Sequence, residues 1–195
     1  MTSARIVEGA AFCDCTALTD TKFGNELERF DRGAFTNCTS LERITIPLKD
    51  GMITDDDIFT GCRNLKHVDL VEGEELRETI AALLMERWRN DMNEEINSIN
   101  QNLPNAPAGE WDNYDDVGEK ALVIRSWIWS LISKFNRYEE EHQRVLDVAA
   151  ATLELALPRD IAINNVLSFL ELPPHTFGVE DREDAEGDDS GTEEE

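Results

Sequence analysis

Residues 33–47 read GAFTNCTSLERITIP, and the same pattern occurs in residues 9–18, GAAFCDCTAL, and in residues 58–70, IFTGCRNLKHVDL. Aligned without gaps, a phenylalanine, a cysteine and a leucine recur at intervals of 23 and then 24 residues. The three columns are Phe12, Phe35 and Phe59; Cys15, Cys38 and Cys62; and Leu18, Leu41 and Leu65. A register kept by three residue types over two intervals predicts stacked structural repeats, for which about three units are the usual minimum.

A short strand is predicted after the leucine of each repeat. Ile44-Thr45-Ile46 and Val68-Asp69-Leu70 alternate apolar and polar residues, as half-buried strands do. The matching triplet of the first repeat, Thr21-Lys22-Phe23, follows this pattern less well. We expect the apolar members to point inward, the polar ones to face the concave surface, and the phenylalanines to stack in a column opposite the strands.

The spacing and the consensus GAFxxCxxLxxIxIP resemble the BspA-like leucine-rich-repeat family over about residues 9–70. This resemblance implies a protein-binding solenoid of about three coils, with no cofactor and no catalytic residues. The later segment EEEHQRVLDVAAATLELAL, residues 139–157, is similar to the helical tails of repeat proteins from unicellular algae. The weak first strand and the lack of a preceding cap predict a truncated array.

Helices are predicted after the repeats, over about residues 74–102, 119–157 and 160–171. In the first, apolar residues fall three or four apart: Leu76, Ile80, Leu84, Trp88, Met92, Ile96 and Ile99. The second has a heptad seam of Ala121, Ile124, Ile128, Leu131, Phe135, Tyr138, His142, Val145 and Ala149. This pattern favours an antiparallel hairpin of the two long helices. The alternative is a coiled-coil homodimer through residues 119–157.

The expected fold class is therefore α+β, a leucine-rich-repeat solenoid followed by a helical hairpin and a short third helix. The expected domains are the solenoid at residues 1–72, the helical region at residues 73–172 and a disordered acidic tail at residues 173–195. Residues 178–195 hold ten acidic residues and one arginine, a composition that cannot build an apolar core.

The charge of the chain excludes several classes of partner. A formal net charge of −24 argues against nucleic acid, which needs a basic footprint, and against anionic membrane surfaces. No run of about eighteen apolar residues predicts a membrane-spanning helix. The N-terminal residues lack the apolar stretch of a signal peptide, so we expect a cytoplasmic protein, with the nucleus possible, and reduced cysteines.

The sequence offers no pattern that indicates catalysis, a metal or a cofactor. Cysteines in register on successive coils form a line, which cannot enclose a zinc ion tetrahedrally. Asp55, Asp56 and Asp57 lack the spacing of a calcium loop and fit the first turn of a short helix. Glu139 and His142 form only one Glu-x-x-His pair, whereas di-iron bundles need two. We therefore expect a protein that is not an enzyme.

The candidate protein-binding surface is the set of outward strand residues Arg43, Thr45, His67 and Asp69, extended by Asp20 and Lys22. Trp111 and Trp129 form a second candidate, because exposed tryptophans are enriched in binding hot spots. The predicted function is a non-catalytic protein–protein interaction module whose protein partner the sequence does not identify.

Two alternatives remain open at this point. The segment LPRDIAINNVLSFLELP, residues 157–173, resembles the first half of an F-box, which implies a substrate adaptor of a ubiquitin ligase. Ile163, Val166, Leu167 and Leu170 would then fill an apolar groove on a ligase subunit. The other alternative is a gene fragment with no autonomous function.

Overall fold

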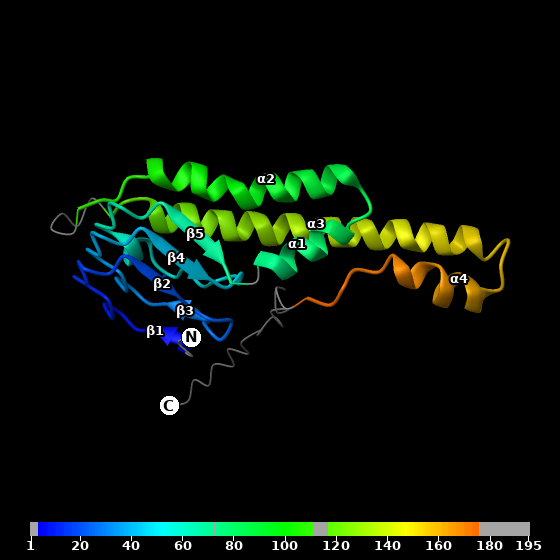
Figure 1. The fold of residues 1–195 in the computed structure, drawn as a ribbon, viewed down its shortest axis with the longest axis horizontal. Coiled ribbons are helices and arrows are strands. Elements are labelled where there is room, and N and C mark those ends of the chain that lie inside the picture. Colours follow the sequence, from blue (N-terminus) through cyan, green and yellow to red (C-terminus); the bar gives the residue numbers. More distant parts are fainter. Residues whose placement is uncertain (1–3, 72, 111–116, 176–195) are drawn as a thin grey trace, which may run out of the picture.

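The computed structural model describes residues 4–71, 73–110 and 117–175, and it places a region of short strands before a region of long helices (Figure 1). The strands are β1 (Ile6–Val7), β2 (Asp20–Lys22), β3 (Arg29–Phe30), β4 (Arg43–Ile46) and β5 (His67–Leu70). The α-helices are α1 (Gly73–Ala82), α2 (Glu86–Asn102), α3 (Lys120–Leu153) and α4 (Arg159–Asn165). Short 3₁₀ helices are η1 (Asp56–Phe59), η2 (Leu103–Asn105) and η3 (Leu167–Phe169). Mixed helices and strands are thus confirmed, although the sheets are few and small.

The strands form two small parallel sheets whose registers repeat the sequence intervals. In the larger sheet β4 lies between β2 and β5, and Asp20, Arg43 and His67 are paired in one row. In the smaller sheet β1 pairs with β3, and Phe30 forms a further parallel bridge with Ile53. The sequence analysis predicted the larger sheet and missed the smaller one, because that sheet rests on one or two residues per repeat.

The phenylalanine column is confirmed. The Phe12 and Phe35 rings are stacked with centroids 5.0 Å apart, and the Phe35 and Phe59 rings are stacked at 5.6 Å. The cysteine column runs beside it, with the Cys38 thiol donating to the carbonyl of Phe12 at 2.9 Å and Cys62 to that of Phe35 at 3.0 Å. Each buried thiol therefore satisfies a carbonyl of the preceding repeat, as a small apolar side chain with a weak donor can.

The prediction of one continuous helix over about residues 74–102 was wrong, because the chain leaves the helix between α1 and α2. The backbone N–H of Leu84 donates to Nδ1 of His142 on α3 at 3.3 Å. The guanidinium of Arg89 donates to the carbonyls of Leu83 and Leu84. These side-chain hydrogen bonds replace those that a continuous helix would have made at the break.

Helices α2 and α3 lie side by side and antiparallel (Figure 1). The heptad positions of α3 are buried from Ala121 to His142, but Val145 is 43% exposed and Leu146 is buried instead. A straight α-helix has 3.6 residues per turn and drifts from a 3.5-residue repeat, so the buried face has moved by one position here. The structure ends α3 at Leu153, four residues before the predicted end.

The third predicted helix, residues 160–171, is shorter in the structure and is divided into α4 and η3. Pro158 fixes its start as the N-terminal cap residue. Of the tail predicted at residues 173–195, only residues 173–175 lie within the described part of the chain.

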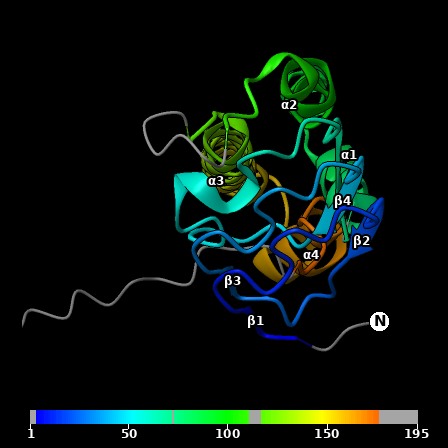
Figure 2. The same cartoon turned by 90° about the vertical axis from the view of Figure 1, so that its left-hand side faces the viewer.

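The helices attach to the last repeat. Buried Lys120 at the start of α3 donates to the carbonyls of Leu65, at 2.9 Å, and Leu103, at 3.0 Å. The N–H of Gly61 donates to the carbonyl of Ala108 at 2.8 Å. In the end-on view, α2 and α3 lie on one side of the repeats and β1 and β3 on the other (Figure 2). The outward-facing residues of the larger sheet stay exposed or partly exposed next to these helices.

Candidate functional site

The polar residues predicted to face outward lie in two rows across the larger sheet. One row is Asp20, Arg43 and His67, and the other is Lys22, Thr45 and Asp69. We call these six residues the outer strip. The residues between the two rows, Ile44 and Val68, are buried, as the alternation of side chains along a strand requires.

Arg43 connects the strip across three strands. Its guanidinium lies 2.5 Å from a carboxylate oxygen of Asp69 on β5 and 3.8 Å from one of Asp20 on β2. The hydrogen bond with Asp69 and the charge of that carboxylate raise the pKa of Arg43 above its usual value. Arg43 is therefore held as a cation between two anions, and the two rows are tied together at the surface.

The outer strip is close to neutral on a strongly acidic protein. Asp20 and Asp69 balance Arg43 and Lys22, whereas the whole chain carries a net charge of −24. Accessible cations and a balanced charge therefore distinguish the outer strip from the acidic chain as a whole. The strip offers donors, acceptors and one imidazole, His67, on a fixed sheet.

The three consecutive aspartates, Asp55, Asp56 and Asp57, have a structural role. Asp56 and Asp57 lie in the first turn of η1, as predicted, with Asp55 as its cap residue. The Asp57 carboxylate accepts hydrogen bonds from the Gly33 N–H at 3.0 Å and from Arg32 at 2.8 Å, so it fastens the third repeat to the second. Within residues 4–71, 73–110 and 117–175, no group of three or more potential ligands is placed to hold a metal ion.

Glu139 and His142 do not form a common site. His142 is buried, accepts a hydrogen bond from Leu84 and contacts the carbonyl of Leu170 at 2.7 Å through Nε2. Glu139 instead pairs with His175, whose Nε2 lies 3.3 Å from its carboxylate. Since Nδ1 of His142 is an acceptor, Nε2 carries the proton and donates to Leu170. The imidazole therefore links the α1–α2 break with the segment after α4.

Of the two tryptophans predicted to form a second surface, the structure describes Trp129, on α3. Trp127 is buried, and its indole N–H donates to the carbonyl of Glu95 on α2 at 2.9 Å. Trp129 follows two residues later, about 200° around the helix, and is 64% exposed. It therefore faces away from the side of α3 that packs on α2. Trp111 lies outside the described residues.

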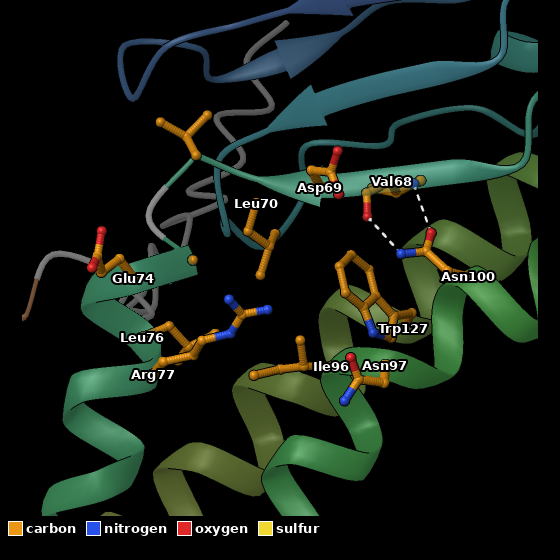
Figure 3. A pocket seen from close by; sticks show the side chains of 12 residues that line it. Val68, Asp69, Leu70, Glu74, Leu76, Arg77, Ile96, Asn97, Asn100 and Trp127 are labelled. Atoms are coloured by element: carbon orange, nitrogen blue, oxygen red, sulfur yellow. Dashed lines mark hydrogen bonds between the residues drawn. The ribbon is translucent and has the colours of Figure 1, made fainter.

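Sequence reasoning missed a cavity of about 270 Å³ where β5 meets α1 and α2 (Figure 3). Its wall includes Asp69 of the outer strip and also Leu70, Arg77, Ile96 and Asn100. In the sequence, Leu70, Arg77 and Ile96 fitted a buried strand and an ordinary amphipathic helix. Only the packing of α1 and α2 against the sheet edge reveals that they share a cavity.

Residues 2–81 match the family model described as BspA type Leucine rich repeat region (6 copies). The repeat prediction is confirmed. The match extends beyond the resemblance at about residues 9–70: it also covers β1, which lies inside the predicted solenoid of residues 1–72, and most of α1, which was predicted to lie outside it.

No curated protein and no solved structure matches the chain. The helical character of the segment after the repeats is confirmed by α1 to α4, while its likeness to algal repeat proteins stays a prediction. Among the helices of the described residues, none combines the length and the apolar character needed to cross a membrane.

Proposed function

We propose that the repeats form a short solenoid that acts as a non-catalytic protein-interaction module, with the outer strip as its contact surface. Leucine-rich repeats are commonly used for protein binding, and the match over residues 2–81 supports this class of function. The observation that carries the choice of surface is the pair of ionic contacts by which Arg43 on β4 joins Asp20 on β2 and Asp69 on β5. It fixes charged groups on a rigid sheet without neutralising them by burial.

A charge swap tests the proposal. The double variant Arg43→Asp with Asp69→Arg retains an ion pair between β4 and β5 but reverses both charges, so the fold is expected to persist. Partners recovered by affinity purification with the intact chain should fall by about tenfold, the effect of roughly 1.4 kcal/mol of lost affinity. Unchanged recovery of every partner would refute the assignment to the outer strip.

The smaller sheet supplies a matched control. Arg29 and Asp31 form an ion pair at 2.7 Å at the smaller sheet, which does not include any residue of the outer strip. The swap Arg29→Asp with Asp31→Arg makes the same chemical change away from the outer strip. It should leave partner recovery unchanged, and an equal loss in both swaps would show that the effect is not specific to the strip.

A second candidate function is supported by the end of the chain that follows α3. Val166, Phe169 and Leu170 are exposed apolar residues, with Phe169 at 84%, whereas Leu167 is buried. An exposed apolar face on residues 157–173 suits an F-box-like adaptor that inserts it into a groove of a ubiquitin-ligase subunit. Co-purification with that subunit, lost on Leu170→Asp and retained on Asn164→Asp, would support this role.

A further inference from the structure

The outer edge of β5 is half covered, and the other half opens into the cavity beside α1 (Figure 3). The N–H of Val68 donates to the side-chain oxygen of Asn100 on α2 at 3.0 Å, and the Asn100 amide group lies 3.5 Å from the Val68 carbonyl. The amide side chain thus takes the place of a neighbouring strand for one residue. This contact protects only the first part of the edge.

The backbone of Leu70 points to the same open side as that of Val68. The N–H groups of His67 and Val71 both donate toward β4, to the carbonyls of Glu42 and Ile46. In a parallel ladder alternate residues bond to alternate sides, so Val68 and Leu70 bond away from β4. Leu70 therefore presents one donor and one acceptor to the cavity.

The rest of the cavity wall provides an apolar floor and one cation. Leu70, Leu76, Ile96 and Trp127 line it, and Arg77 extends from α1 toward Leu70 and Ile96. Within the described parts of the chain, no ion pair joins Arg77 to a carboxylate. Of the nearby acids, Asp69 is already paired with Arg43, and Glu74 points away from the guanidinium (Figure 3).

From these features we infer that the β5 edge is a second binding site, one that takes a short extended peptide as an added strand. The peptide pairs with the N–H and carbonyl of Leu70, places an apolar side chain in the cavity and sets a carboxylate against Arg77. Residues two apart in a strand lie on one face, so the apolar and acidic residues of the peptide are spaced i and i+2. The cavity volume of about 270 Å³ suits one or two side chains.

This site goes beyond the outer strip and shares only Asp69 with it. The strip lies on the face of the sheet, whereas the peptide would lie along its edge. Failure of the peptide to bind would leave the charge-swap result on the strip unaffected.

The test uses the full chain and the peptide acetyl-Thr-Leu-Thr-Asp-Thr-amide, followed by two-dimensional ¹H–¹⁵N NMR. We expect the amide signals of Leu70 and Gly73 to shift with a Kd of about 1 mM, as a contact of this size allows. Arg77→Glu should weaken binding at least about tenfold, and a peptide with lysine in place of the aspartate should weaken it similarly. The exposed Arg63, on a turn of the third repeat, gives the matched control Arg63→Glu, which should leave the Kd unchanged.

Two further measurements separate strand addition from simple apolar contact. Gly73 has room for a side chain, since a Cβ there would lie 4.0 Å from that of Leu70, so Gly73→Phe should fill the cavity and abolish binding without unfolding α1. Of two peptides N-methylated at alternate amides, one in each register, one should no longer bind, because its methyl group replaces the N–H that would donate to the Leu70 carbonyl. Unshifted Leu70 at several times the expected Kd of about 1 mM, or full binding by both methylated peptides, would overturn the inference.

Discussion

Phe35→Ala should remove more stability than the equivalent change at Phe12, because the two rings occupy different places in the same column. Phe35 is completely buried and touches four other rings: Phe12, Phe23, Phe30 and Phe59. Phe12 is partly exposed, and its ring stacks on Phe35.

The expected size follows from these contacts. Truncating a buried phenylalanine to alanine costs about 3–5 kcal/mol of unfolding free energy. Each aromatic pair contributes about 0.5–1.5 kcal/mol beyond the area it buries, so four pairs place Phe35→Ala near the upper end, at about 5 kcal/mol. Phe12→Ala, with one ring pair and part of its surface already in water, should cost about 2 kcal/mol.

Urea unfolding followed by far-UV circular dichroism measures both values. A loss of about 5 kcal/mol approaches the whole stability of many domains, so Phe35→Leu and Phe12→Leu are made alongside, with smaller losses in the same order. The reasoning is refuted if either substitution at Phe35 destabilises the protein no more than its counterpart at Phe12.

Three further predictions concern buried and paired groups. Lys120→Met should cost about 1–2 kcal/mol of unfolding free energy near neutral pH. The loss of a donor for two carbonyls destabilises the fold, and the removal of a buried charge offsets part of this cost. Burial lowers the pKa of Lys120 below its usual 10.5, so the folded protein is penalised while the lysine is charged. The stability of the unmodified protein relative to Lys120→Met should therefore rise as the pH rises from the lowered pKa of the folded protein towards the usual 10.5, measured by urea unfolding. The hydrogen bond from the Tyr138 hydroxyl lowers the pKa of Asp91, so Tyr138→Phe should raise this pKa. On acidification, the stabilisation by the Asp91 carboxylate should then be lost at a higher pH. NMR titration of the carboxyl would measure the change. In native protein Cys38 and Cys62 should resist a thiol reagent because they are fully buried, whereas unfolded protein should titrate all four cysteines; rapid native labelling of the buried pair would contradict their packing role.

The repeat columns could be predicted from the sequence because their signal is redundant. Three residue types share one register, so an error at one position does not hide the period. The smaller sheet could not be predicted in the same way. Val7, Phe30 and Ile53 do recur every 23 residues, but an isolated apolar residue of varying type carries too little information to identify a strand.

The helices show where periodicity stops being sufficient. The apolar spacing continues through Leu84 without a glycine or proline, so the local sequence does not predict the break before α2. It depends on His142 and Arg89, which are distant in sequence or follow the break. Similarly, the edge site needs Leu70 and Arg77 to face one cavity, which only tertiary packing decides.

The change of interval from 23 to 24 residues separates the part of the array that can be copied from the part that cannot. The extra residue falls between Ile53 and Phe59, where η1 replaces a plain turn. The contacts of α3 with Asp56 and Leu65, and of the loop before α3 with Gly61, all belong to that third repeat. Duplication of residues 24–46 would therefore insert one more unit in register and leave the helix contacts of the third repeat intact. A duplication that includes η1 would copy the surface that contacts the helices and leave one copy of this surface uncovered. Gene duplication can thus lengthen this protein from its first two repeats, while the third acts as a fixed terminus.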